Sequence, residues 1–270
     1  MKKEREIVWL IIAILLVCVA LAVIFYTRHM RSKNEGNNSE KHEPYRPVQA
    51  TTYEKITDEA DEDSCDLSGL IFTKYKPTSK KALSSFQNYI VLDCETTGLS
   101  PKTDEIIEIA MAKYIDGELS DEFQCFVRPT VPLPPMITRL TGITQKDLET
   151  APYISDIIDD IWLFLAGFTL VAHNASFDIG FLRTAFAMSE FEGEFEYLDT
   201  LYLARKAYPD LKNHKLETLI VELGISELQT HRAMDDVLCT QKILEKSLEV
   251  LLEKKEEELS ERRRKKALTK

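Results

Sequence analysis

The sequence predicts an α/β fold, a sheet flanked by helices, behind an N-terminal transmembrane helix. Three observations lead to this expectation. An uncharged run of 21 residues, Ile7–Thr27, is almost entirely apolar. Beyond residue 85, short apolar runs of strand length alternate with segments of helical period. Their order, three strands and a helix followed by a strand and more helices, is typical of an α/β sheet.

The run Ile7–Thr27 is long enough to cross a bilayer, since a rise of ~1.5 Å per residue gives about 30 Å. Trp9 and Tyr26 lie near its two ends, where aromatic side chains favour the membrane interface. Lys and Arg flank the run on both sides, so the positive-inside rule gives no orientation. We expect an uncleaved single-pass anchor. The alternative is a cleaved signal peptide, which would release the rest of the chain as a secreted protein.

Composition divides the rest of the chain into three parts. Residues 28–85 are polar and predict a flexible linker, residues 86–250 carry the pattern of a globular domain, and residues 251–270 form a charged tail. The net charge of the chain is −11, and residues 86–248 carry 13 basic and 27 acidic side chains. Phosphate binding depends on Lys and Arg, so this balance argues against a protein that coats long duplex DNA.

The five cysteines are widely spaced and include no C-x-x-C pair. This spacing argues against a disulfide scaffold and against a cysteine zinc site, and it favours a reducing compartment. We therefore expect the globular domain to face the cytoplasm from its membrane helix.

Apolar runs and helical spacing give the elements of the globular domain in order. The predicted strands are 89–92, 106–115, 122–127 and 169–172. Asp116-Gly117, between the second and third strands, predicts a hairpin turn. The predicted helices are 154–165, 177–188, 200–207, 215–223 and 233–252.

Acidic residues end the first strand and open the helix after the fourth. Asp93 and Glu95 end the first strand, and residues i and i+2 of a strand share a face. Two carboxylates on one face repel each other unless a cation lies between them. Asp178 opens the helix after the fourth strand, where simple capping also explains a carboxylate. Each of these acids has an ordinary structural explanation when it is taken alone.

His231 and two acids mark the start of the last predicted helix. Asp235 and Asp236 differ by about 100° around a helix, so only one of them can face a centre shared with other acids. An acidic first turn is also favourable by itself, because of the helix dipole. The spacing therefore allows one of these acids to share a cation with the other acids, but it does not require this.

Taken together, the residues read D-x-E, then D, then H-x4-D along the chain. In this pattern the sequence resembles the DEDDh 3′–5′ exonucleases, especially the epsilon proofreading subunit of bacterial DNA polymerase III and the exonuclease domain of PolC-type polymerases. The matching stretches are 90–99, 106–110, 140–144, 171–182, 198–201 and 231–236. The resemblance covers roughly residues 88–248. It implies an RNase H-like fold with a mixed five-stranded sheet.

The resemblance also implies a metal site and a nucleotide site. The implied metal ligands are Asp93, Glu95, Asp178 and Asp236. They are expected to hold two Mg²⁺ or Mn²⁺ ions, which prefer oxygen ligands. His231 is the implied general base, because an imidazole takes up a proton near neutral pH. The implied substrate-binding residues are Thr96, Thr97, Gly98, Leu99, His173, Asn174 and Phe177.

We therefore expect a metal-dependent 3′–5′ exonuclease that releases nucleoside 5′-monophosphates from single-stranded DNA or from 3′ ends. Its expected partners are nucleic acid 3′ ends and, through the apolar helix, a membrane; the sequence names no polymerase or other protein partner. One alternative is an exonuclease of the same fold for RNA or oligoribonucleotides, since recognition of the 2′-OH depends on pocket geometry. The other is an inactive, membrane-bound scaffold that binds nucleic acid, although all five residues of the catalytic pattern are present.

Overall fold

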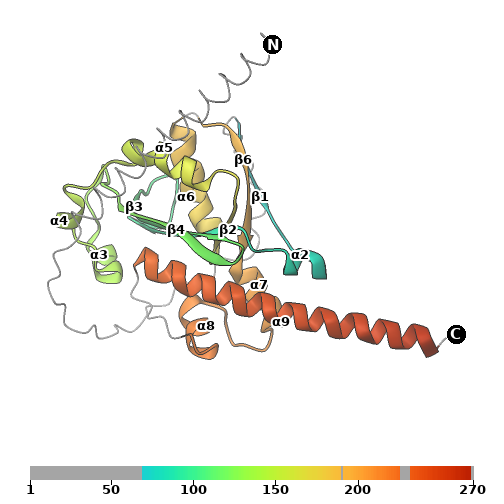
Figure 1. Ribbon diagram of the computed structural model, residues 1–270. Coiled ribbons are helices and arrows are strands. Elements are labelled where there is room, and N and C mark those ends of the chain that lie inside the picture. Colours follow the sequence, from blue (N-terminus) through green and yellow to red (C-terminus); the bar gives the residue numbers. More distant parts are fainter. Residues whose placement is uncertain (1–68, 190, 226–231, 269–270) are drawn as a thin grey trace, which may run out of the picture. The chain divides into compact units, whose positions relative to one another are not determined.

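Within residues 69–189, 191–225 and 232–268, which the structure describes, the computed structural model forms one sheet of six strands (Figure 1). The order across the sheet is β1-β6-β5-β2-β3-β4. The strands are β1 (Leu70–Lys74), β2 (Tyr89–Thr96), β3 (Ile106–Ile115), β4 (Glu118–Phe126), β5 (Thr169–Ala172) and β6 (Gly193–Asp199). β2, β3 and β4 are antiparallel neighbours, whereas β5 runs parallel to β2 and β6, and β6 runs parallel to β1.

Helices lie on both faces of this mixed sheet (Figure 1). They are α2 (Lys80–Ser84), α3 (Pro135–Thr141), α4 (Gln145–Leu148), α5 (Ile154–Leu165), α6 (Ser176–Met188), α7 (Thr200–Ala207), α8 (Leu216–Glu222) and α9 (Ala233–Leu268). Buried residues of α5 and α6 pack against one face of β2 and β3, and buried residues of α7 and α9 pack against the other.

The alternation of side chains along β2 decides which residues face which layer. Ile90, Leu92 and Cys94 are buried in the core that includes α5 and α6. Tyr89 and Val91 instead belong to the core beneath α9. Since successive side chains of a strand point to opposite faces, the next odd-numbered residues of β2 also lie on the α9 face.

Small residues on β3 allow α9 to approach this face closely. Ala110 and Ala112 lie opposite Asp93 and Val91 in the antiparallel register, and both alanines are fully buried in the core that includes α9. Because each alanine adds only a methyl group to the sheet surface, the first turns of α9 can reach the end of β2.

The predicted α/β class and all four predicted strands are confirmed, with β2 extending beyond Leu92 to Thr96. The implied count of five strands is wrong, because the described residues form six. Neither β1 nor β6 was predicted from the sequence. In β6, for example, exposed Glu194 and Glu196 flank buried Phe195, so the strand contains no continuous apolar run.

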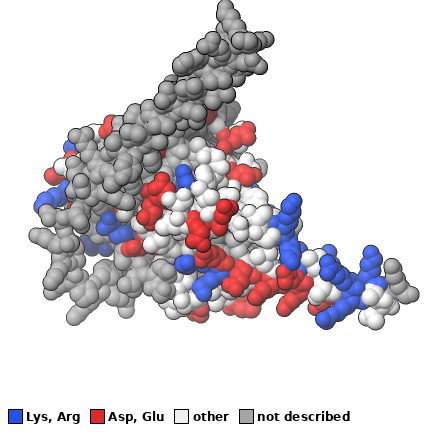
Figure 2. Space-filling view, viewed as in Figure 1, with Lys and Arg blue, Asp and Glu red and all other residues white. Residues whose placement is uncertain are grey.

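β1 and α2 lie within residues 28–85, the predicted linker. Since β1 pairs with β6 along its whole length, the described end of this segment belongs to the sheet; residues 28–68 lie outside the described residues. The predicted tail at 251–270 continues α9 as a helix as far as Leu268. Acidic side chains gather along the middle of α9 and basic ones toward its C-terminal end (Figure 2).

The membrane location predicted from the sequence is corrected by the structure. Within the described ranges, no helix is both long enough and apolar enough to cross a bilayer. α9 has 36 residues, which is sufficient length, but charged side chains recur along it. The run Ile7–Thr27, on which the prediction was based, lies outside the described residues.

Candidate active site

The end of β2 projects beyond its parallel neighbour. β5 pairs with β2 only opposite Tyr89–Val91, so none of the described strands pairs with β2 on that side after this point. The backbone N–H of Cys94 donates instead to the Asp178 carboxylate, with N and Oδ1 3.0 Å apart. Asp178 lies in the first turn of α6 and is 2% exposed. This bond holds the Asp178 side chain against β2, next to the residue between Asp93 and Glu95.

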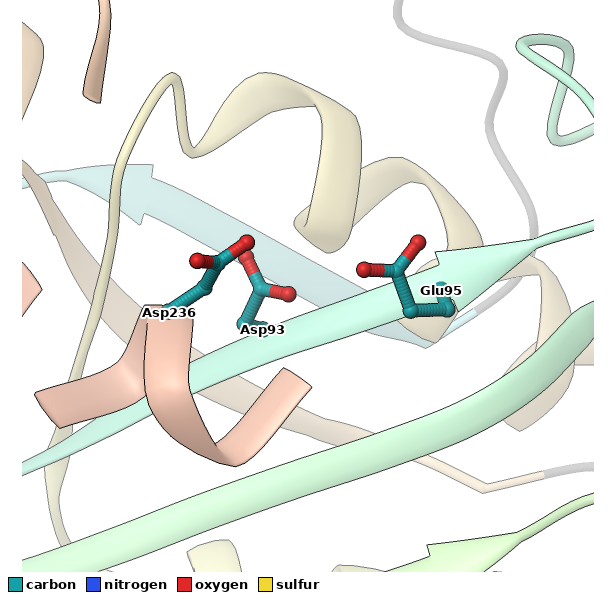
Figure 3. Close-up of side chains that lie close together, drawn as sticks. All are labelled: Asp93, Glu95 and Asp236. Atoms are coloured by element: carbon teal, nitrogen blue, oxygen red, sulfur yellow. The ribbon is translucent and has the colours of Figure 1, made fainter. Parts of the chain in front are cut away.

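Asp93, Glu95 and Asp236 converge on one point. Each offers one carboxylate oxygen, and the three oxygens lie within 4.8 Å of one another. Figure 3 shows Asp93 and Glu95 projecting from β2 and Asp236 from the first turns of α9. Among the described residues, Asp235 does not belong to this group, as expected for a side chain about 100° away on the helix.

Burial and the neighbouring charges raise the pKa values of Asp93, Glu95 and Asp178. Burial raises the pKa of Asp93 well above its usual value, and the charges of Asp178, Asp236 and Glu95 raise it further. Burial, followed by the charge of Asp236, raises the pKa of Glu95 to about 8. Burial also raises the pKa of Asp178 to about 8, although hydrogen bonds from backbone N–H groups oppose the shift. A divalent cation among these carboxylates would remove the repulsion.

The donor set fits a hard divalent cation. The converging atoms are carboxylate oxygens, which Mg²⁺ and Mn²⁺ prefer as ligands. Cys94, the thiol between the two acids of β2, is buried in the core on the opposite face, so it adds no soft ligand. The residues present therefore suit Mg²⁺ or Mn²⁺ better than a metal that binds thiolate.

We expect the metal-free chain to lose stability as the pH rises from about 5 to about 8. Glu95 and Asp178 have pKa values of about 8 in the folded state, above the usual 4.5 and 3.8. The folded state thus keeps protons that the unfolded chain has released, so the free energy of unfolding falls across this window. Urea unfolding of the full chain in EDTA at several pH values measures this slope. Mg²⁺ should flatten it, whereas stability that rises with pH in EDTA would show that these pKa values are not raised.

The loop after β2 is held in place beside the acids. The backbone N–H of Thr97 donates to the Glu105 carbonyl at 2.8 Å, and its hydroxyl accepts from the Glu105 backbone N–H at 2.9 Å. Gly98 lies against the Asp104 carboxylate, whose nearest oxygen would be 2.5 Å from a Cβ at this position. Leu99 follows and is 63% exposed. The loop thus presents an apolar side chain on a fixed backbone, which suits contact with a nucleobase.

Three predicted substrate residues lie in the loop between β5 and α6 and in the first turn of α6. Both ring nitrogens of His173 are engaged, Nδ1 with the Thr200 hydroxyl at 2.8 Å and Nε2 with the His214 carbonyl at 2.9 Å. Burial lowers the pKa of His173, which favours the neutral ring. Asn174 is exposed and has a φ of +62°, and Phe177 is partly buried against the core. These contacts favour a bracing role for His173, while Asn174 and Phe177 stay predicted substrate residues.

Three further residues complete the comparison with the sequence. Thr96 is buried, and its hydroxyl donates to the Gly98 carbonyl at 2.5 Å, so it shapes the loop from within. His231 lies outside the described residues, and its role as general base stays a prediction. Glu108 is an acid within the apolar strand β3 and is 1% exposed, and no role was predicted for it from the sequence. A charged residue inside an apolar run was the signal that could have identified it.

A mixed sheet with paired acids at the end of a central strand, joined by acids from two helices, defines a class of enzyme that hydrolyses phosphodiester bonds. The chain belongs to the RNase_T exonuclease family, whose model, described as "Exonuclease", matches residues 90–244. The protein is therefore a nuclease, and the exonuclease resemblance predicted from the sequence is confirmed.

Curated relatives agree with this assignment. The DNA polymerase III PolC-type of Bacillus subtilis is 44% identical over 170 residues, which cover 62% of this chain and 12% of the relative. The protein of the same name from Caldanaerobacter subterraneus subsp. tengcongensis is 40% identical over 176 residues, which cover 65% of this chain and 13% of the relative. The chain therefore spans about an eighth of the length of these relatives.

Solved structures show the same fold. Escherichia coli exonuclease I, in complex with a dA16 oligonucleotide, has a TM-score of 0.54 and 19% sequence identity. The match covers 62% of this chain and 42% of the E. coli protein. The mixed sheet and its flanking helices are thus an exonuclease fold of the RNase H-like type.

Proposed function

We propose that the chain is a metal-dependent 3′–5′ exonuclease that releases nucleoside 5′-monophosphates from single-stranded DNA or from 3′ ends. The observation that supports this most strongly is the convergence of acids from β2, α6 and α9 at the open end of β2. A DNA substrate is supported by the relatives, which are named DNA polymerases, and by the exonuclease I structure, which contains dA16.

In this proposal the four acids hold the metal ions and the adjoining loops hold the substrate. Asp93, Glu95, Asp178 and Asp236 would bind two Mg²⁺ or Mn²⁺ ions, which supply an activated water and neutralise phosphate charge when bound. The rigid loop after β2 would fix the 3′-terminal nucleotide, with Leu99 against its base. His231, one residue before Arg232 in the sequence, would take the proton from the attacking water.

We also propose that the catalytic unit includes β1, so that it begins before the residue 86 predicted from the sequence. β1 covers the edge of β6, and an exposed sheet edge invites pairing with other chains. A fragment that begins after Lys74 would lack this strand. Activity is therefore best measured on the full chain.

The full chain, supplied with Mg²⁺, should be compared on 5′-labelled single-stranded DNA, on a duplex with a mismatched 3′ end and on RNA of the same sequence. We expect a ladder of labelled products that shorten from the 3′ end, with nucleoside 5′-monophosphates released. Immediate release of the 5′ label, or cutting at internal positions only, would exclude the proposed polarity. Faster degradation of RNA than of either DNA would favour the RNA alternative.

A further inference from the structure

Glu108 is a further acid on the face of the sheet that carries Asp93 and Glu95. It is 1% exposed, and the antiparallel register places it directly opposite Glu95. Like charges directly opposite each other on one face of a sheet are destabilising. A buried carboxylate in this position therefore needs compensation from neighbouring donors.

Four donors supply this compensation. Arg232 donates through Nε to Oε2 at 3.1 Å and through Nη2 to Oε1 at 2.9 Å, the paired geometry of a guanidinium on a carboxylate. Gln124 on β4 donates through Nε2 to Oε1 at 2.9 Å. The backbone N–H of Ala233 donates to Oε2 at 3.4 Å. Glu108 thus accepts hydrogen bonds on both oxygens, and it serves as the acceptor at the N-terminus of α9.

These bonds fix the first turn of α9 on β3. Arg232 immediately precedes the helix, and its guanidinium also lies over the ring of Phe126 at 5.0 Å from the centroid. Asp236 is one turn further along, and its backbone N–H donates to the Arg232 carbonyl at 3.2 Å. β3 is the hydrogen-bonded neighbour of β2, which carries the other acids of the site. The bonds between Arg232 and Glu108 therefore set where Asp236 lies relative to Asp93 and Glu95.

We propose that Arg232 and Glu108 are positioning residues of the metal site, and that their paired bond holds Asp236 in reach of the acids on β2. Neither residue touches the reacting atoms in this account. The expected change in kcat rests on the proposed function, whereas the expected change in Mn²⁺ affinity does not. Partners that orient metal ligands typically change metal affinity or activity by about 10- to 100-fold when they are mutated.

The test compares the full chain with the double variant Glu108→Gln/Arg232→Met and with Arg232→Lys. Arg232→Met alone would leave a buried carboxylate uncompensated and could unfold the chain, so the double variant removes both charges together. The measured quantities are the Tm in EDTA, the Mn²⁺ affinity by electron paramagnetic resonance, and kcat and KM on single-stranded DNA. Lys242→Met is the control, because it breaks an exposed pair with Glu245 on the same helix.

We expect the double variant to keep a Tm within a few degrees of the wild type but to bind Mn²⁺ about tenfold more weakly. Its kcat should fall at least tenfold with little change in KM. Arg232→Lys should lose less Mn²⁺ affinity and less kcat than the double variant, since a lysine keeps the charge but not the paired geometry. Lys242→Met should match the wild type throughout.

Wild-type Mn²⁺ affinity in the double variant would overturn the inference, because the pair would then contribute only to stability. The inference would also be overturned if, across the double variant and Arg232→Lys, each weakening of Mn²⁺ binding came with a matching fall in Tm. A wild-type chain that binds Mn²⁺ but does not cleave DNA would instead refute the proposed function. In that case the comparison of Mn²⁺ affinities would still decide whether the pair positions the site.

Discussion

Asp236→Asn is expected to abolish nucleotide release while leaving the fold intact. Asparagine has nearly the same shape as aspartate, but it removes one of three converging carboxylates and its charge. Losing several kcal/mol of metal-dependent charge stabilisation corresponds to a fall in kcat of about 10³-fold. The Tm in EDTA should rise slightly, because the remaining acids repel one another less. Asp93→Asn should behave in the same way.

Steady-state turnover on single-stranded DNA in Mg²⁺, with Tm measured in EDTA, tests this expectation. Asp235→Asn is the matched control. It removes the charge next to Asp236, and among the described residues Asp235 is not one of the three converging acids. It should retain most of the wild-type kcat. If Asp236→Asn cleaved DNA at the wild-type rate, the catalytic site would have to lie elsewhere on the chain.

His231→Ala is expected to lower turnover by about 10²–10⁴-fold, the range typical of a general base. Mn²⁺ affinity should hardly change, because the base acts on the attacking water and does not bind the metal in this account. Part of the activity should return at high pH, where the water loses its proton without help. Electron paramagnetic resonance with Mn²⁺ separates the two roles. Loss of Mn²⁺ binding in His231→Ala would make the histidine a ligand.

The acid pair of β2 illustrates what could be predicted from the sequence. Asp93 and Glu95 follow an apolar run, so strand periodicity alone places them on one face. Choosing Asp236 over Asp235 needed the spacing of a resembled family, and the structure brings Asp236 to the pair. Local patterns of this kind are readable because each depends on residues close together in the chain.

Features that depend on distant partners were harder to predict. β6 has an acidic exposed face, and its strand conformation becomes evident only from its pairing with β5 on one side and β1 on the other. Glu108 sits in an apolar run, but its partner Arg232 is 124 residues away in the sequence. His173 resembled a substrate residue, and only the positions of Thr200 and His214 show that both ring nitrogens are engaged.

We propose above that the acids at the end of β2 hold the metal ions that drive hydrolysis. Cleavage of 5′-labelled single-stranded DNA by the full chain, measured against Mn²⁺ concentration after complete chelation and dialysis, tests it most directly. We expect no cleavage without metal and a saturable recovery as Mn²⁺ is added, with Mg²⁺ also effective. Cleavage that persists at the same rate after all metal has been removed would contradict it.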